Sequence, residues 1–393
     1  MIRNLTRRRW LRSAGLTALG LGLGGRAGSG LRAQEAAATA PAPGELWRPP
    51  PEGKHINLAG NENPFGPSPA VVRRILKAAP ESCRYPFREE FVLKEMLARR
   101  EGVPVENIAL GNGCDELLAL AAIVALGGKQ RELVAAHPTY FQLPDYAENM
   151  GATVRWVPHR RDTMQHDLAA MAAAVGADTG LVYVCNPDNP SGTMVDAAEL
   201  TAFCREVAPR APVFLDEVYL ELVDDWPTLT QVQLVRDGLP VMIGRSFSKM
   251  HGLAGHRIGY VVTTPELARR LEGRRMSSVN FIGVAAARES LFDLDFHRWT
   301  IGKIREGRER FYDVCDELGL TYTRSHGNFV FHRTGIPMGD YQEMMKARGF
   351  LTGWPHDPVE PYVDWCRVSI GTDSEMAQYA AAMRAVFAER LRS

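Results

Sequence analysis

Short apolar runs alternate with amphipathic stretches between about residues 107 and 270, and this alternation constrains the fold more than any other feature of the sequence. The apolar runs are NIAL, ELVAAH, TVRWVP, GLVYVCNP, VFLDEVY, PVMIGRSFS and RIGYVVT. They are rich in Val, Ile and aromatic residues and end in turn residues, which is typical of buried strands. Stretches such as CDELLALAAIVAL and AAELTAFCREVA predict helices between them. Strands that alternate with helices predict an α/β fold, in which a mainly parallel sheet is covered by helices on both faces.

The pattern changes from about residue 283 onward. A long helical stretch over 284–318 precedes the strand-like runs NFVFH and CRVSIGT and a closing helix. We therefore expect a large domain over 85–282 and a smaller α+β domain formed by 283–393 together with 55–84. A chain of 393 residues with 45% hydrophobic content is long enough for both. Lys+Arg and Asp+Glu both number 46, and this zero formal charge argues for a small-molecule partner rather than nucleic acid.

Residues 1–33 have the layout of an export signal: a basic run, a short apolar stretch interrupted by glycines, and small residues. The segment Thr6–Arg12, TRRRWLR, resembles the twin-arginine export motif, with Trp10 where Phe is usual. A disordered basic leader and a misplaced start codon are the alternatives. A Pro-rich linker over 34–54 would follow, and the mature chain would work in the periplasm. The six cysteines show no CxxC and no metal-type spacing, so we expect no metal site and mostly buried thiols, with a disulfide left open.

Ligands of open α/β sheets bind beyond the carboxyl ends of the strands, so candidate site residues should follow the strand runs. The stretch LGNGCDELLALAA reads as a strand, a glycine turn and a helix start. The free amides of Gly113, Cys114 and Asp115 would then form an anion site at the helix N-terminus. An ordinary turn with an aspartate cap is the alternative.

Two further stretches place polar groups after strands. VFLDEVYLEL ends its strand on Asp216, with Tyr219 three residues on. A buried carboxylate needs a partner, which could be a pyridinium N–H or an arginine. In NPDNPSGT, Asn189 is held extended by the proline that follows it, and its amide could donate to a ring oxygen. A loop without function is the alternative there.

The stretch SFSKMHGLAGHRIGY supplies the remaining groups. Ser246 and Ser248 offer hydroxyl donors, and Arg257 offers a cationic fork suited to phosphate. Burial and nearby positive charge would lower the pKa of Lys249, as a nucleophilic amine requires. A surface lysine fits poorly beside GLAG. A phosphate cradle, an acid for a ring nitrogen, donors for a ring oxygen and an amine for an imine together indicate pyridoxal 5'-phosphate as the cofactor.

Residues from about 55 to 385 resemble the class I/II aminotransferases of fold type I, in particular the histidinol-phosphate aminotransferase-like group. The stretches that carry the resemblance are NLAGNENPFGPSP, YP at 85–86, GNGCDELL, HPTY, NPDNPSG, LDEVY, SFSKMHGLAGHRIGY, GNFVF and CRVSIGT.

The resemblance implies a role for each matching residue. Lys249 would form the Schiff base with the cofactor and move the proton. Asp216 would keep the pyridine nitrogen protonated. Tyr140, in HPTY, would stack on the ring, while Asn189 and Tyr219 would bind its O3' oxygen.

The cofactor phosphate would be held by the glycine turn of GNGCDELL and by the stretch SFSKMHGLAGHRIGY. The groups implied are the amides of Cys114 and Asp115, the hydroxyls of Ser246 and Ser248, and the guanidinium of Arg257.

Three more positions carry over. Arg367, in CRVSIG, would grip the substrate carboxylate, and Asn63 would line the substrate pocket. Tyr85 would reach the phosphate in a partner subunit, which implies a homodimer with shared active sites.

One departure bears on the substrate. Gly353 stands where histidinol-phosphate aminotransferases usually carry an arginine for the substrate phosphate, and no Lys or Arg occurs from Gly349 to Cys366. Export argues the same way, because histidine biosynthesis is cytoplasmic. We therefore expect an aminotransferase that acts on a non-phosphorylated amino acid and a 2-oxo acid. An aromatic pocket is suggested by Trp354, Tyr362 and Trp365, although aromatic residues are more often core.

Other functions remain open on the same motifs. A pyridoxal-phosphate lyase, decarboxylase or oxidase would need the same cofactor-binding residues, as would a histidinol-phosphate aminotransferase proper. A cofactor-sensing domain of a transcription regulator is disfavoured, because no helix-turn-helix pattern precedes the fold.

Overall fold

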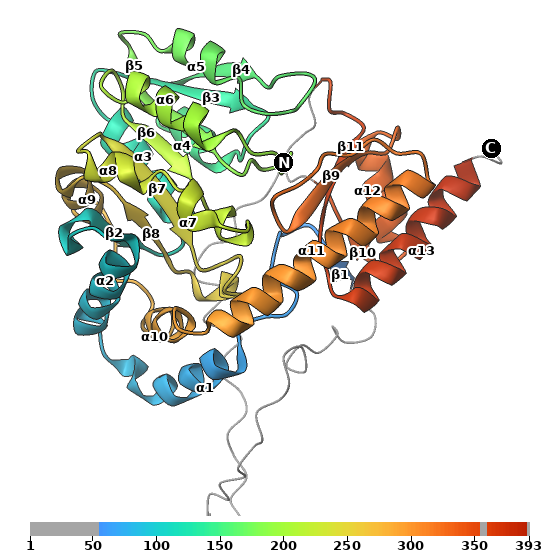
Figure 1. Cartoon of the computed structure of the whole chain (residues 1–393), viewed down its shortest axis with the longest axis horizontal. Coiled ribbons are helices and arrows are strands. Elements are labelled where there is room, and N and C mark those ends of the chain that lie inside the picture. Colours follow the sequence, from blue (N-terminus) through green and yellow to red (C-terminus); the bar gives the residue numbers. More distant parts are fainter. Residues whose placement is uncertain (1–54, 354–359, 391–393) are drawn as a thin grey trace, which may run out of the picture. The chain divides into compact units, whose positions relative to one another are not determined.

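The computed structural model describes residues 55–353 and 360–390 (Figure 1). The expected export signal and linker, at 1–33 and 34–54, lie outside the described residues, as does Trp354, so the predictions made for them stay predictions. Within the described ranges, none of the helices combines the length and the apolar character that a membrane crossing requires.

A seven-stranded sheet forms the centre of the larger part of the chain, in the order β2-β8-β7-β6-β5-β3-β4. Its strands are β2 (Ile108–Gly111), β3 (Glu132–His137), β4 (Thr153–Pro158), β5 (Thr179–Cys185), β6 (Val213–Asp216), β7 (Val241–Ser246) and β8 (Gly259–Val262). Only β8 runs against its neighbours, β2 and β7; the pairs among β3 to β7 are parallel. All seven apolar runs of the sequence form strands, so the predicted mainly parallel sheet is confirmed.

Helices cover both faces of this sheet because neighbouring residues of each strand point to opposite sides. In β6, Val213 and Leu215 belong to one apolar core and Phe214 to the other. The helices that pack around these two cores are α2 (Phe87–Glu101), α3 (Cys114–Leu126), α4 (Gln142–Asn149), α5 (Leu168–Ala174), α6 (Ala197–Val207), α8 (Val232–Arg236) and α9 (Pro265–Glu272). The strands therefore read as nearly continuous apolar runs in the sequence.

A smaller lobe lies at one side of the sheet (Figure 1). Its elements are β1 (Ile56–Asn57), α11 (Leu294–Glu317), β9 (Phe329–Arg333), α12 (Met338–Lys346), β10 (Phe350–Leu351), β11 (Trp365–Ser369) and α13 (Asp373–Arg390). Strands β9 and β11 pair antiparallel, and β1 pairs parallel with β10. Leu58, Phe311, Val330 and Tyr379 share its core, so the start of the described chain packs with its end.

Two helices that were expected to belong to the smaller domain pack with the large sheet. The other expected domain limits stay a prediction. Helix α1 (Pro69–Ala78) lies along α10 (Phe281–Ser290), as Figure 1 shows. Val71 and Val284 are buried in a core of the large sheet and not in that of the smaller lobe. The segment 55–84 is thus divided between the two cores.

The remaining short elements are α7 (Trp226–Leu229) and the 3-10 turns at Ala79–Cys83, Val105–Asn107, Leu220–Leu222 and Ala254–His256. All six cysteines are free, and all but Cys83 are buried.

We expect the replacement of Arg245 by methionine to lower the free energy of unfolding by about 3–5 kcal/mol, because it leaves buried carboxylates without their cation. Arg245 is fully buried on β7, with its Nη2 3.0 Å from Glu217 and 3.8 Å from Glu101. Urea unfolding of the parent and the Arg245→Met variant measures the loss. The control is Arg205→Met, which removes an ion pair to Asp237 at the surface and should change stability little. Equal losses in both variants would contradict this account.

Candidate active site

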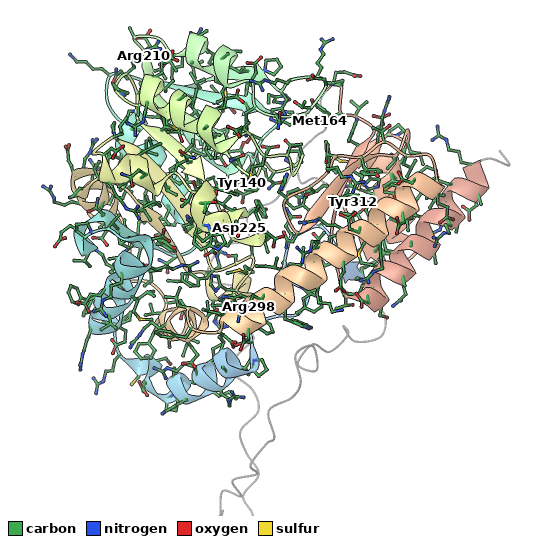
Figure 2. The ribbon with its side chains drawn as sticks, viewed as in Figure 1. Tyr140, Met164, Arg210, Asp225, Arg298 and Tyr312 are labelled. Carbon is green, nitrogen blue, oxygen red and sulfur yellow. The ribbon has the colours of Figure 1, made fainter. Side chains whose placement is uncertain are left out.

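The carboxyl ends of β5, β6 and β7 lie side by side and open into a cavity of about 460 Å³. Cys185 is in register with Asp216, and Asp216 with Gly244, so the loops after these strands emerge at one edge of the sheet. The polar and charged residues that line the cavity are Asn61, Glu62, Asp115, Tyr140, Asn189, Asp216, Tyr219, Ser246, Ser248, Lys249, Arg257 and Arg367. Tyr140 is labelled in Figure 2 on the side of the large sheet that faces the smaller lobe. Most of these residues were predicted from the sequence, and the structure brings them together at one cavity.

Lys249 lies in the loop after β7 and is half-buried. Its Nζ has one weak hydrogen bond, at 3.4 Å to the carbonyl of Gly60, and lies 5.4 Å from the centroid of the Tyr219 ring. Burial and the positive charge of Arg367 lower its pKa to about 8. Near neutral pH a substantial fraction of this amine is therefore unprotonated, which is the form that attacks a carbonyl.

Asp216 ends β6 and is buried. It accepts hydrogen bonds from the Tyr183 hydroxyl at 3.1 Å and from the Val218 amide at 3.3 Å. Burial raises its pKa to about 7. No arginine or lysine of the described residues forms an ion pair with it, which disfavours the salt bridge that the sequence left open. A protonated ring nitrogen in the cavity would be the missing cationic donor.

A polar cluster stands around the Tyr219 hydroxyl. The Tyr219 hydroxyl accepts a hydrogen bond from Asn61 Nδ2 at 3.0 Å and lies 3.5 Å from Asn189 Nδ2. Burial raises the pKa of Tyr219, so the phenol stays protonated and can donate. Asn189 also accepts from Arg367 Nη1 at 2.5 Å. These contacts fix the side chains that the sequence assigned to a ring oxygen and to a substrate anion.

The far end of the cavity suits a phosphate. Helix α3 begins at Cys114, after Gly113 with φ +83°. A Cβ at Gly113 would lie 2.2 Å from Nη2 of Arg257, so only glycine lets the guanidinium lie against this turn. The free amides of a helix start, this cation and the hydroxyls of Ser246 and Ser248 converge on one place.

Arg257 and Tyr140 are both held by Asp115. Arg257 Nη2 donates to Asp115 at 2.9 Å, and the Tyr140 hydroxyl donates to the other carboxylate oxygen at 2.9 Å. Asp115 therefore orients Arg257 and Tyr140 at once. The residues present fit pyridoxal 5'-phosphate at its phosphate, ring nitrogen, ring oxygen and aldehyde positions.

Three predicted site residues do not line this cavity. The amide of Gly113, expected to be free for an anion, donates to the carbonyl of Gly111 at 2.9 Å. Asn63 is buried beneath it, where its Nδ2 donates to the carbonyl of Met250 at 2.9 Å, so it ties the N-terminal segment to the lysine loop. Tyr85 is 77% exposed and stacks on Phe87, so it contributes nothing to the site of its own chain. Its expected contact with a partner subunit stays a prediction.

Tyr362 and Trp365, expected near an aromatic substrate pocket, line a separate cavity. The aromatic and apolar lining of the active-site cavity comes instead from Tyr140, Phe141 and Val218.

Sequence reasoning missed several residues of the site, among them Asn61 and Tyr183. Asn61 reaches Tyr219 from the N-terminal segment, and its positive φ of 51° is not visible in the sequence. Tyr183 looks like one more apolar residue of β5, and its hydroxyl is the only sign of a role. Both contacts join segments that are far apart in the chain.

Beneath the lysine loop, a buried charged network holds His251. Its Nε2 lies 3.3 Å from Glu221, its Nδ1 is 2.7 Å from the Ser290 hydroxyl, and Glu221 also pairs with Arg100. Although burial opposes it, the charges of Arg100 and His251 hold the pKa of Glu221 well below its usual range. The loop that carries Lys249 is therefore anchored two residues beyond it.

Comparisons with known proteins agree with this geometry. A family model described as "Aminotransferase class I and II" matches residues 53–383. The histidinol-phosphate aminotransferase of Moorella thermoacetica is 38% identical over 341 residues, which cover 85% of this chain and 86% of that protein.

Solved structures are similar as well. A putative histidinol-phosphate aminotransferase from Erwinia carotovora atroseptica is 31% identical with a TM-score of 0.80, covering 86% of this chain and 97% of that one. A histidinol-phosphate aminotransferase from Sinorhizobium meliloti, solved with pyridoxal 5'-phosphate, is 32% identical with a TM-score of 0.79, covering 86% and 91%.

The cofactor-free chain can be labelled at Lys249 with pyridoxal 5'-phosphate followed by borohydride. We expect the labelling rate to rise with pH up to about pH 8 and to stay constant above it. The lowered pKa sets this limit, because only the neutral amine reacts. Below pH 8 the neutral fraction should grow about tenfold per pH unit, whereas an ordinary lysine would keep gaining to about pH 10.4. Peptide mass spectrometry measures the label, and Lys249→Ala is the control. A labelling rate at Lys249 that climbs steadily to pH 10 would contradict the lowered pKa.

Proposed function

The chain belongs to the class I and II aminotransferases, and from this premise we propose that it moves the amino group of a non-phosphorylated amino acid to a 2-oxo acid. It is a pyridoxal-phosphate-dependent enzyme of fold type I. The observation that carries the proposal is Arg367, a buried arginine of β11 that lines the same cavity as Lys249. Two parts of its guanidinium are fixed by Asn189 and by the carbonyl of Ala59. Its Nε has no hydrogen-bond partner among the described residues.

The chain's own groups divide the work between them. When bound, the cofactor supplies an aldehyde that exchanges for the amino group and a ring that withdraws electrons from the substrate's α-carbon. Lys249, neutral in part near pH 8, can take a proton from that carbon and return it. Asp216 holds a proton at the ring nitrogen, and Tyr219 and Asn189 bind the ring oxygen. Arg367 fixes the substrate carboxylate, which orients the α-carbon toward Lys249.

The charges of the cavity favour a substrate with a single negative charge. Three cations line it: Lys249, Arg257 and Arg367. If Arg257 holds the cofactor phosphate and Lys249 the aldehyde carbon, Arg367 alone remains for the substrate. Glu62 lines the same cavity and would repel a second negative charge.

Gly353 supports the same conclusion. Its φ is +118°, a conformation that residues with a Cβ rarely adopt. A Cβ there would lie 1.8 Å from Gln342 Nε2. An arginine for a substrate phosphate therefore has no room at this position unless the backbone and Gln342 move. The apolar lining by Phe141 and Val218 leaves an aromatic or other apolar side chain as a candidate for the donor.

Histidinol phosphate is the second candidate donor, because the similar proteins reported above are named histidinol-phosphate aminotransferases. Arg367 would then meet the phosphate, since a guanidinium fork binds a carboxylate and a phosphate equally well in geometry. A lyase, decarboxylase or oxidase reaction is the third, and it differs by needing no 2-oxo acid.

The decisive experiment follows the visible absorbance of the cofactor-loaded enzyme as amino acids are added one at a time without any 2-oxo acid. Histidinol phosphate belongs in the panel. We expect a carboxylate-bearing, non-phosphorylated donor to remove the absorbance and a 2-oxo acid to restore it. A response to histidinol phosphate alone would contradict the proposed substrate. Carbon dioxide, ammonia or peroxide formed without an acceptor would identify a different reaction.

Two variants control this experiment. Lys249→Ala should bind donors but show no turnover, and near-normal activity would refute the assigned role. Arg367→Gln should raise the KM for the donor about 10- to 100-fold, since it removes charge-assisted hydrogen bonds to the substrate anion. Arg367→Lys should recover part of the loss, because it keeps the charge without the fork.

We also propose a homodimer with shared active sites. Tyr85, Phe87 and Phe91 are exposed aromatic residues near the start of α2, an apolar surface that a partner subunit would cover. Light scattering should give twice the mass of one chain, and Tyr85→Phe should weaken cofactor binding if the hydroxyl reaches the partner's phosphate. A monomer with full cofactor affinity would exclude this arrangement.

A further inference from the structure

A second cavity, of about 680 Å³, lies apart from the active site, where the end of β4 approaches the smaller lobe. His137 and His159 line it from the large sheet, and Tyr362 and Trp365 from the smaller lobe. Met164, another of its lining residues, is labelled in Figure 2 at the edge of the large sheet toward that lobe. Nothing in the proposed reaction uses this cavity.

Next to this cavity, three ionisable residues from three separate segments of the chain lie close together. His159 follows β4, His166 precedes α5, and Asp188 lies in the loop after β5. They are 4%, 1% and 0% exposed, respectively. One ring nitrogen from each histidine and one oxygen of Asp188 all lie within 4.8 Å of one another. The shortest approaches to Asp188 are 3.9 Å from His159 Nε2 and 3.6 Å from His166 Nε2.

Three of the four ring nitrogens of these two histidines lack a hydrogen-bond partner among the described residues. Neither ring nitrogen of His159 has a hydrogen bond among the described residues, and neither does Nδ1 of His166. Leaving buried polar atoms unpaired destabilises the fold. At 3.6–3.9 Å the histidines are also too far from Asp188 for direct hydrogen bonds. Some group that can take up their lone pairs is therefore missing from the contacts within the chain.

The surroundings resemble the supporting contacts of a metal site. His166 Nε2 lies 2.7 Å from the carbonyl of Cys185, the kind of contact that fixes the tautomer of a metal-binding histidine. Asp188 accepts from the amide and hydroxyl of Ser191 and from the hydroxyl of Thr139. These three bonds orient the carboxylate and leave about one acceptor position open.

We propose that His159, His166 and Asp188 bind one divalent transition-metal ion, for which Zn²⁺ suits the ligand set best. Two imidazoles and one carboxylate are ligands that Zn²⁺ commonly takes, whereas Mg²⁺ and Ca²⁺ prefer oxygen alone. Ligand atoms of tetrahedral Zn²⁺ lie about 3.3 Å apart. The ligand atoms of the cluster, which lie within 4.8 Å of one another, would have to close to this spacing when the ion binds.

His159 also lines the second cavity, so the proposed site lies next to it. The ion would also brace the active site. Asp188 is bonded in sequence to Asn189, whose Oδ1 holds Arg367. The inference does not depend on which substrate the enzyme takes.

The test measures metal binding by the untagged, cofactor-loaded enzyme after chelator treatment and dialysis. Zn²⁺ is titrated by calorimetry, and the bound metal is counted by mass spectrometry of the element. We expect one Zn²⁺ per chain, and at least tenfold weaker binding in His159→Gln, His166→Gln and Asp188→Asn. Co²⁺ should give the visible bands of a low-symmetry, four- or five-coordinate site. No stoichiometric Zn²⁺ in the parent enzyme would overturn the proposal.

Two matched controls separate this site from others. His332→Gln replaces a buried histidine of the smaller lobe outside the cluster, and Cys83→Ala removes the one exposed thiol. Both should bind Zn²⁺ as the parent does. Unchanged affinity in His159→Gln, or loss in Cys83→Ala, would place the ion elsewhere and refute the assignment. If the cluster variants lose their bound cofactor, the parent's Co²⁺ spectrum decides: octahedral, oxygen-type bands would overturn the proposal.

Discussion

Parallel pairing of β5, β6 and β7 in one continuous register is the constraint on which the rest of the structure depends. It ends three strands at the same edge, so that the NPDNPSG loop, Asp216 and the loop of Lys249 emerge together. A slip of one residue in β6 would turn Phe214 into the wrong core and Asp216 away from the cavity. The apolar cores on both faces resist such a slip, and their burial therefore also fixes the geometry of the chemistry.

This placement buries two ionisable groups, Asp216 and, in part, Lys249, for which the chain supplies no ion-pair partner among the described residues. The pKa of Asp216 is raised to about 7 and that of Lys249 is lowered to about 8, each chiefly by burial. Both shifts mean that the ionised form is disfavoured in the folded chain. A cofactor with a cationic ring nitrogen and an electrophilic carbon relieves both at once. Cofactor binding should therefore add to the stability of the folded enzyme, since it binds the native state alone.

The sequence was sufficient for features that are local in the chain. Asp216 and Lys249 could be placed because each follows its own strand run directly, and the parallel edge then brings them together. Contacts between distant segments could not be read in this way. The contact of Asn61 with Tyr219 depends on how the N-terminal segment crosses the cavity, and the contact of Tyr183 with Asp216 depends on the register of β5 and β6.

The errors have the same origin. Tyr362, which precedes β11, and Trp365, its first residue, were expected near a substrate pocket but line another cavity. Asn63 lies in a segment that crosses the site, but its amide turns to the carbonyl of Met250. Alternation along a strand decides which residue faces a pocket, and a shift of one or two positions is enough to change the answer.

The loop of Lys249 and the loop of Asn189 are each fixed by hydrogen bonds or ion pairs to buried polar groups. Below Lys249, His251 is fixed by Glu221, which Arg100 keeps ionised. Next to Asn189, Asp188 is fixed by Ser191 and Thr139 and faces His159, which has no hydrogen bond among the described residues, and His166, whose Nδ1 has none.

The two supports differ in one physical respect. The network under Lys249 is balanced within the chain, because the cation of Arg100 meets the anion of Glu221. The cluster next to Asn189 contains one carboxylate and two imidazoles with three ring nitrogens that have no hydrogen bond among the described residues, and we propose that an ion binds all three groups. The first loop can therefore reach its working geometry by folding alone, whereas the second can gain rigidity from an ion. Because Asn189 holds Arg367, that gain would appear where the substrate anion binds.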